Sequence, residues 1–232
     1  MLPAAVLPAA VLLDLDGTLV DSESVHAEAI ARYMAGRGVE LDERERAFVI
    51  GHAWQEIYAE LRVGERLGDD LPTLQAGTDR ARAQMRAEGI TMRILDGAVE
   101  LVTTLVELEI PTAIVSGSCR AEIADALELL GVGHHLRMYL GAEDYPRGKP
   151  APDGYLAAAG QLAVAPASCL VFEDSEAGIA SGLAAGMRVV ATSAANRPPG
   201  TAGHQDQQRA HRIVPQLTGI DREFLSAVML GL

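Results

Sequence analysis

The chain has 232 residues, 49% of them hydrophobic and 22% charged, enough to bury the core of one large domain or of one domain with a smaller companion. Its formal net charge of −13 argues against nucleic acids and anionic membrane surfaces as partners, because both bind clustered Lys and Arg. No apolar run of about 18 residues predicts a membrane span, so we expect no membrane partner. Cys119 and Cys169 lie far apart, and we expect reduced thiols and a cytoplasmic location.

The first predicted element is a strand that ends in a short acidic stretch. An apolar run begins at Val11 and is interrupted by Asp14, Asp16 and Gly17. Residues two apart in a strand point to one face, so we expect Asp14 and Asp16 to lie side by side. Two carboxylates at the end of a buried strand repel one another and lose solvation, and a hard cation such as Mg²⁺ relieves both costs. Taken alone, the fragment fits a surface turn equally well, since Asp and Gly are common turn residues.

The block that follows, residues 21–92, shows no strand pattern. Runs rich in Ala and other helix formers, separated by Gly and Pro, predict four helices. Their expected ranges are residues 26–34, 42–50, 54–61 and 74–87. We therefore expect a small helical domain inserted directly after the first strand.

From Leu95 onward, predicted helices and strands alternate. The expected helices are residues 98–108, 121–130 (ended by Gly131), 153–161 (capped by Asp153) and 177–185. The expected strands are residues 112–115, 138–140, 169–172, 188–191 and 213–214. Such alternation predicts a parallel sheet covered by helices on both faces, the α/β class. Ligands bind such sheets at the carboxyl ends of the strands, where each candidate chemical group stands in this sequence.

The strand at 112–115 is followed by Ser116, Gly117 and Ser118 at the start of a predicted helix. Free backbone N–H groups at a helix start attract an anion, and the hydroxyls add donors. A plain Ser cap and turn is the alternative, which the tripeptide alone fits better.

Lys149 is the single lysine among 19 Lys and Arg residues. It lies in the stiff segment 147–153, just before a predicted helix. An ammonium is a compact point charge for which Arg is no equivalent, so we expect a specific role for it. Chance placement on a solvated loop is the alternative.

Glu173, Asp174 and Ser175 follow the predicted strand 169–172 and repeat the acidic arrangement of the first strand. With them the predicted site has enough oxygen ligands for Mg²⁺. Ser175 and Glu176 also fit the ordinary first residues of a helix.

Taken together, Asp14-x-Asp16-Gly17-Thr18, Ser116, Lys149 and Glu173-Asp174 resemble, in order and setting, the motifs of the haloacid dehalogenase superfamily. The resemblance covers nearly the whole chain. Tracts 148–153 and 172–178 are similar to the branch that holds beta-phosphoglucomutase and many sugar-phosphate phosphatases. The resemblance implies a Rossmann-like α/β core, residues 1–20 and 93–232, with an all-helical cap, residues 21–92, inserted after the first strand.

The resemblance also implies roles for the motif residues. Asp14 is the expected nucleophile that forms an aspartyl-phosphate, and Asp16 protonates the leaving oxygen and then deprotonates the attacking water. Mg²⁺ is the expected cofactor, held by Asp14, by Asp16 through its backbone carbonyl, and by Asp174, with Glu173 close by. Ser116 and Lys149 hold the phosphoryl oxygens. The remaining candidates for phosphate or substrate binding are Thr18, Gly117, Ser118, His26, His52, Trp54 and Gln55.

Two branches of the superfamily are disfavoured by single residues. Asp16 argues against a dehalogenase, because that branch lacks the second acid and uses no metal. The absence of Lys from residues 21–92 argues against a phosphonoacetaldehyde hydrolase, whose cap Lys forms a Schiff base.

We expect a Mg²⁺-dependent phosphatase for a small phosphomonoester, with a beta-phosphoglucomutase-type sugar phosphomutase as the alternative. His26 matches a mutase His that some phosphatases also carry, and it fits a partly exposed helix position equally well. Thr18 stands where such mutases have Val, and Trp54 stands where their cap has an Arg that grips a second phosphate. An indole cannot pair with a phosphate dianion, so tract 51–55 suggests a substrate with one phosphate and a hydroxylated or apolar remainder. Packing between cap helices explains Trp54 equally well.

A non-catalytic signalling domain that accepts a phosphoryl group on Asp is a remote alternative. Such domains are about half this length, have adjacent acids on the first strand and lack a helical insertion. The expected partner is a small phosphorylated metabolite, and the expected assembly is a monomer or a weak homodimer.

Overall fold

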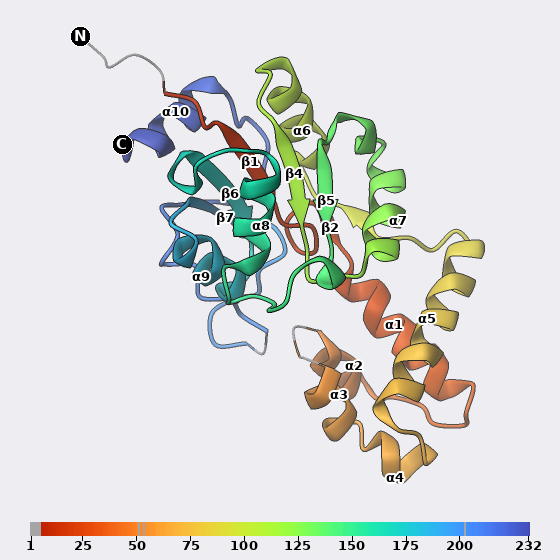
Figure 1. The fold of residues 1–232 in the computed structure, drawn as a ribbon. Helices are drawn as coiled ribbons and strands as arrows, with labels where there is room; N and C mark the ends of the chain where they lie inside the picture. Colours follow the sequence, from red (N-terminus) through yellow and green to blue (C-terminus); the bar gives the residue numbers. More distant parts are fainter. Residues whose placement is uncertain (1–5, 51, 53, 202) are drawn as a thin grey trace. The chain divides into compact units, whose positions relative to one another are not determined.

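The structure, a computed structural model, describes residues 6–50, 52, 54–201 and 203–232. Gly51 and Ala53, in the tract singled out above, lie outside the described residues. The chain forms two compact units (Figure 1). The α/β unit holds the residues up to Asp21, Ile94–Asn196 and Gln205–Leu232, and the helical unit holds Ser22–Arg93 and Arg197–His204. The sequence shows no sign that would separate residues 197–204 from the expected core.

The α/β unit contains a six-stranded sheet in the order β5-β4-β1-β6-β7-β8, and its strand pairs are parallel, as predicted. The strands are β1 (Ala10–Leu13), β4 (Thr112–Val115), β5 (Met138–Leu140), β6 (Cys169–Glu173), β7 (Arg188–Thr192) and β8 (Arg212–Val214). Leu13 of β1 pairs with Ile114 of β4 on one side and with Phe172 of β6 on the other. This register brings the carboxyl ends of the three strands to one edge of the sheet.

Helices accompany the strands, as the alternation predicted. Those described in the α/β unit are α6 (Ala98–Glu107), α7 (Arg120–Leu130), α8 (Asp153–Gln161), α9 (Glu176–Ala184) and α10 (Arg222–Leu230). Gly131 ends α7 with a φ of 68°, a left-handed conformation that glycine adopts without strain. The predicted cap Asp153 is wrong: Pro152 occupies the cap position, and the Asp153 carboxylate accepts hydrogen bonds from Arg147 at 3.0 and 2.8 Å.

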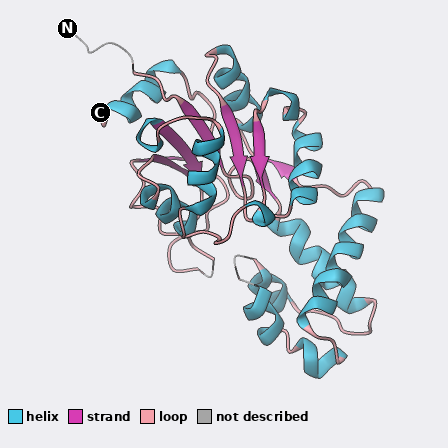
Figure 2. Ribbon diagram, viewed as in Figure 1, coloured by secondary structure: helices cyan, strands magenta, loops and turns pink. Residues whose placement is uncertain are grey.

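Both faces of the sheet are covered (Figure 2). Leu12 and Val171 belong to a buried cluster with Ile179 of α9. Residues alternate between the faces of a strand, so Val11 and Leu13 point the other way, and both are fully buried as well. Strands buried on both faces need continuous apolar sequence, which is why these runs are recognisable without an alignment.

The helical unit is built from α1 (Glu23–Ala35), α2 (Glu43–Val49), α3 (Trp54–Glu60), α4 (Val63–Leu67) and α5 (Leu71–Ala87). Ile30, Met34 and Leu74 lie in its buried core. α5 begins three residues earlier than predicted, because the Asp70 carboxylate caps it by accepting a hydrogen bond from the Thr73 amide. The short α4 was not predicted. The two-residue strands β2 (Val20–Asp21) and β3 (Arg93–Ile94) pair with one another where the chain passes between the units.

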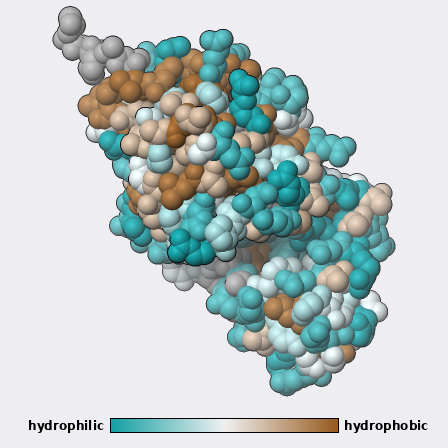
Figure 3. All heavy atoms as spheres, in the orientation of Figure 1, coloured by the Kyte–Doolittle hydropathy of each residue, from teal (hydrophilic) through white to brown (hydrophobic). Residues whose placement is uncertain are grey.

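The surface carries few large apolar side chains, among them Val6 and Leu232. Figure 3 shows apolar surface gathered beside the N-terminal segment and α10, whereas polar residues dominate the visible face of the helical unit. Among the helices in the described residues, none combines the length and the apolar character that a membrane crossing requires.

Candidate active site

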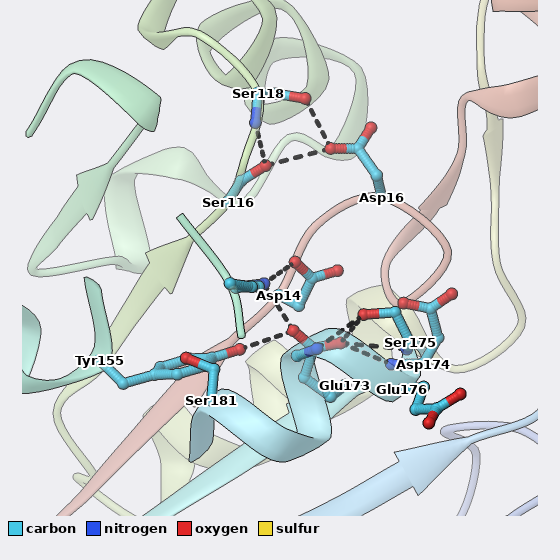
Figure 4. A network of polar contacts seen from close by, with 12 residues as sticks. Asp14, Asp16, Ser116, Ser118, Tyr155, Glu173, Asp174, Ser175, Glu176 and Ser181 are labelled. Atoms are coloured by element: carbon cyan, nitrogen blue, oxygen red, sulfur yellow. Dashed lines mark hydrogen bonds and ion pairs between the residues drawn. The ribbon is translucent and has the colours of Figure 1, made fainter. Parts of the chain in front are cut away.

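Two strand ends and the segment before α8 bring charged side chains together at the edge of the sheet (Figure 4). Asp14 directly follows β1, and its Oδ1 accepts a hydrogen bond from Lys149 Nζ at 2.5 Å. Lys149 Nζ also donates to Oε1 of Glu173, the last residue of β6, at 2.5 Å. Glu173 is fully buried and Asp14 almost so. Lys149, for which the sequence predicts a specific role, therefore bridges two buried carboxylates with one ammonium group.

This network shifts the pKa values of its members. Burial, and then the nearby Glu173 charge, raises the pKa of Asp14 from 3.8 to about 7, although Lys149 opposes the shift. Burial lowers the pKa of Lys149, but the carboxylates of Asp14 and Glu173 outweigh it and hold that pKa well above its usual value. The lysine therefore stays positively charged, whereas any further charge near Asp14 would change the pKa of its carboxyl group.

Both oxygens of Glu173 are occupied by donors. Oε1 accepts from Lys149 and, at 2.9 Å, from the Tyr155 hydroxyl. Oε2 accepts from the amides of Asp174 and Ser175 at 3.0 and 3.1 Å and from the Ser175 hydroxyl at 3.1 Å. A carboxylate offers about four lone-pair sites, so these contacts fill it. Glu173 therefore orients Lys149 on one side and the turn after β6 on the other.

Asp14, Glu173 and Asp174 each offer one carboxylate oxygen, and the three atoms lie within 4.8 Å of one another. Asp14 Oδ2 is buried and has no hydrogen-bond partner within the described chain, so it is an acceptor that a bound cation would satisfy. Hard oxygen ligands in a compact cluster suit Mg²⁺. The residues present therefore fit the metal that the sequence predicts.

Gly17 makes this cluster possible. Its φ is +82°, and a Cβ at this position would lie 2.1 Å from Asp174 Oδ2. Any other residue would therefore clash with the Asp174 carboxylate as well as strain the backbone. The D-x-D-G stretch thus needs its glycine to admit the acid supplied by the distant β6 segment.

Asp16 uses different partners from Asp14. Its Oδ2 accepts hydrogen bonds from the Ser116 hydroxyl at 3.1 Å and the Ser118 hydroxyl at 2.7 Å (Figure 4). Asp14 and Asp16 are near enough for the Asp16 charge to add to burial and the Glu173 charge in raising the pKa of Asp14, although their carboxylates bind different partners and β1 already ends at Leu13. The carboxylate of Asp16 is not one of the three in the acidic cluster, and ligation by its backbone carbonyl stays a prediction.

The remaining phosphate-binding candidates of the α/β unit lie in the same two turns. Thr18 is fully buried, and its Oγ1 has no hydrogen-bond partner within the described residues. Gly117 is exposed between the two serines, and a Cβ there would meet nothing within 4 Å. The Ser116 hydroxyl also accepts from the Ser118 amide at 2.9 Å, so the turn is closed by its own side chains.

The helical unit brings three of its side chains together. His26 on α1 lies edge-on to Trp54 on α3, with ring centroids 4.8 Å apart. Arg82 on α5 places Nη2 2.8 Å from Nδ1 of His26. A guanidinium can only donate, so Nδ1 is the acceptor and the ring proton sits on Nε2.

The two other candidates of this unit lie outside that trio. His52 stacks on Phe48 with ring centroids 3.9 Å apart, and Gln55 is exposed on α3. Substrate contact for His26, His52, Trp54 and Gln55 remains a prediction.

Comparison with known proteins adds to this geometry. A family model described as a haloacid dehalogenase-like hydrolase matches residues 8–186. The chain belongs to the haloacid dehalogenase-like hydrolases. The resemblance inferred from the four motifs is thereby confirmed.

Named relatives of this hydrolase include sugar-phosphate phosphatases. It is 37% identical to hexitol phosphatase A of Escherichia coli (strain K12) over 186 residues, covering 79% of this chain and 82% of the relative. It is 35% identical to validoxylamine A 7'-phosphate phosphatase of Streptomyces hygroscopicus subsp. limoneus over 178 residues, covering 76% and 81%. The crystal structure of beta-phosphoglucomutase from Clostridium difficile superposes with a TM-score of 0.73 at 20% identity, covering 97% and 98%, which shows a shared fold.

Some polar residues of the two units make specific contacts but carry no motif. Tyr155 lies on the buried face of α8, where an aromatic residue is ordinarily read as core. Tyr145 donates its hydroxyl to the Ser116 carbonyl at 2.6 Å. Arg82 is one of many arginines in the helical unit, and Gln207 lies far along the chain in a segment without a predicted element. Only the contacts in the folded chain single these four residues out.

Proposed function

We propose that this protein is a Mg²⁺-dependent phosphatase that hydrolyses a small phosphomonoester through an aspartyl-phosphate on Asp14. The observation that carries the proposal is the state of the Asp14 carboxylate. One of its oxygens is held by Lys149, and the other is buried without a partner beside a cluster of acidic oxygens. The phosphatases among the named relatives support the same reaction class.

Asp14 is the group that attacks phosphorus. One oxygen of its carboxylate forms the bond to phosphorus and the other faces the cation; in this structure Oδ1 accepts from Lys149 and Oδ2 is buried without a partner within the described residues. Mg²⁺ would be held by Asp14, Asp174 and the backbone carbonyl of Asp16, and when bound it supplies positive charge beside Asp14 and the phosphoryl oxygens. That charge opposes the burial and the Glu173 repulsion that otherwise raise the pKa of Asp14.

Asp16 acts as general acid and then as general base. In the first step it gives a proton to the oxygen of the leaving alcohol, and in the second it takes a proton from the water that attacks the phosphoenzyme. The hydroxyls of Ser116 and Ser118 hold its carboxylate away from the Asp14 pair. Two acids with separate partners can carry the two roles without sharing one proton.

Lys149 stabilises the negative charge that develops on the transferred phosphoryl group. Ser116 is the hydroxyl donor predicted for the same oxygens. We assign Glu173 mainly to holding Lys149, because both of its oxygens already accept hydrogen bonds from the protein. Its part in metal binding is then secondary to that of Asp14 and Asp174.

The helical unit is the proposed cap that selects the leaving group. His26 accepts from Arg82 through Nδ1, so its ring proton is on Nε2, and it lies edge-on to Trp54. A donor beside an aromatic ring suits a hydroxylated, ring-shaped or polyol leaving group from a substrate that carries one phosphate. The joins at Asp21–Ser22 and Arg93–Ile94 are the proposed hinges for closure over the substrate.

The test is a screen of hexose, hexitol and other small phosphate esters with Mg²⁺, with released phosphate and remaining ester measured in parallel. We expect phosphate in proportion to ester consumed, and no release when EDTA removes the metal. A separate incubation with beta-glucose 1-phosphate and catalytic glucose 1,6-bisphosphate distinguishes the mutase. Rapid formation of glucose 6-phosphate with little free phosphate would overturn the phosphatase assignment.

A further inference from the structure

Gln207 is a buried amide at the edge of the sheet that no motif marks; its exposed fraction is 5%. Its Nε2 donates two hydrogen bonds, to the backbone carbonyl of Asp174 at 2.6 Å and to that of Thr192 at 2.7 Å. Asp174 directly follows β6, and Thr192 is the last residue of β7. One side chain thus ties together the carboxyl ends of two neighbouring strands.

Gln205, two residues earlier, reinforces the same turn. Its Oε1 accepts a hydrogen bond from the Glu176 amide at 2.9 Å. Its own backbone is held on both sides by Asn196, which accepts from the Gln205 amide and donates to the Gln205 carbonyl, both at 2.9 Å. The segment that carries Gln207 is therefore fixed by Asn196 independently of the Gln207–Asp174 contact.

These contacts complete the support of Asp174. Its amide donates to Glu173 at 3.0 Å, and its carbonyl accepts from Gln207, so both of its backbone polar groups are committed. The direction of the Asp174 carboxylate follows from this backbone, because the side chain has only two rotatable bonds and lies against Gly17. Of the three clustered carboxylates, Asp174 is the one that is only half-buried, and packing alone restrains it least.

We propose that Gln207 is a positioning residue for the divalent cation, which it serves by holding the Asp174 carboxylate in the ligand cluster. This inference rests on the metal site in the proposed function and deepens it. Partners behind a metal ligand commonly change metal affinity when removed, because the ligand must then be ordered at the moment of binding. The expected defect is therefore in Mg²⁺ affinity, with catalysis recovered once the metal saturates the site.

The test compares Gln207→Met, which keeps the length and removes both donors, with the matched control Gln208→Met at the exposed neighbouring position. We expect Gln207→Met to raise the Mg²⁺ concentration for half-maximal activity about ten-fold, as loss of a partner behind a ligand typically does. At saturating Mg²⁺ its kcat should stay within about three-fold of wild type, and Gln208→Met should match wild type throughout. The second readout is the Mg²⁺-induced rise in melting temperature without substrate, which should need about ten-fold more metal in Gln207→Met.

Gln205→Leu, at a half-buried position, gives a second variant should Gln207→Met fail to fold. We expect the Mg²⁺ dependence to shift in the same direction but by only about three-fold. Gln205→Leu removes the acceptor of the Glu176 amide, whereas the hydrogen bond from Gln207 to the Asp174 carbonyl remains. Wild-type metal dependence in whichever of the two variants folds, or a kcat loss that saturating Mg²⁺ does not recover, would overturn the positioning role. A wild-type protein that shows no Mg²⁺ dependence in either readout would instead overturn the metal site of the proposed function.

Discussion

The ion pairs of the candidate active site in the α/β unit and those on the surface of the helical unit differ sharply in burial. In the α/β unit, the side chain of Lys149 is 14% exposed and bridges Asp14 and Glu173, which are more buried still. In the helical unit, pairs such as Arg32–Glu28 and Arg44–Glu60 lie at the surface. Water screens a surface pair, so its loss costs little, whereas a buried charge that loses its partner has nothing to replace it.

The difference indicates which parts of the molecule can vary. The proposed reaction depends on a few buried contacts, such as those of Lys149, so we expect a change at any of them to impair the site. The helical unit keeps its apolar core and displays polar residues that can be exchanged at small cost. Such a division permits the same reaction to be combined with different substrates.

The largest expected effect comes from the nucleophile. Asp14→Asn should lower turnover of a phosphomonoester about 10⁴-fold or more, because no other group replaces the attacking oxygen. The far-UV circular dichroism spectrum should be unchanged, since Asn has the same shape. Asp79→Asn, an exposed carboxylate on α5, is the matched control and should keep full activity. Substantial turnover by Asp14→Asn would remove Asp14 from its assigned role.

Substitution of Lys149 tests how much the buried ion pairs contribute to stability. Lys149→Met leaves two buried carboxylates without their shared cation, and we expect the free energy of unfolding to fall by about 3–5 kcal/mol in urea titrations. Lys149→Arg should not restore activity, because the planar fork cannot place a point charge between the two acids.

The surface pair offers the contrast to Lys149. Arg44→Met removes the charge that pairs with Glu60, and the Arg44 side chain is 88% exposed. We expect no measurable change in unfolding or turnover. Equal losses of stability in Lys149→Met and Arg44→Met would erase the distinction between the two units.

A ten-fold effect is expected from the trio in the helical unit. Arg82→Leu removes the donor to Nδ1 of His26, and with it the constraint on which ring nitrogen carries the proton. We expect KM to rise about ten-fold with kcat changed less, because a specificity contact is loosened and the reacting groups stay intact. Arg80→Leu, an exposed neighbour on the same helix, is the control and should leave both constants alone. A drop in kcat with unchanged KM would place Arg82 in the chemical step instead.

A shift of a few degrees in melting temperature is expected from pH in the metal-free protein. The pKa of Asp14 is raised to about 7 by burial and Glu173, above its ordinary 3.8. A group with a raised pKa contributes stability that is present below pH 3.8 and is lost as pH rises through about 7. In EDTA, Asp14→Asn should therefore melt higher than wild type at pH 8 by a few degrees, with a smaller difference at pH 5. An identical difference at both pH values would show that the Asp14 charge is not strained in the metal-free site.

Local sequence patterns predict most of the helices and strands. Strand 112–115 is found as predicted, and Gly131 ends its helix as predicted, because apolar runs and glycine stops are local signals. The five-residue α4 was missed, since it is too short to show a period and it follows Arg62 in a left-handed conformation that no motif announces. The strand at 169–172 reaches one residue further, because Glu173 is buried by partners that lie elsewhere in the chain.

For the site, the sequence by itself determined which residues are the candidates for the chemistry, because Asp14, Lys149 and Asp174 stand in turns that directly follow or precede recognisable elements. Only the tertiary structure decided which of these side chains are in contact. Lys149 lies 135 residues from Asp14, and Ser118 lies 102 residues from Asp16, yet both pairs are in contact. Such contacts depend on the parallel register of β1, β4 and β6. That register results from many small packing interactions across the whole sheet, which no short stretch of sequence contains. For the same reason the roles of Tyr155, Arg82 and Gln207 are visible only in the folded chain.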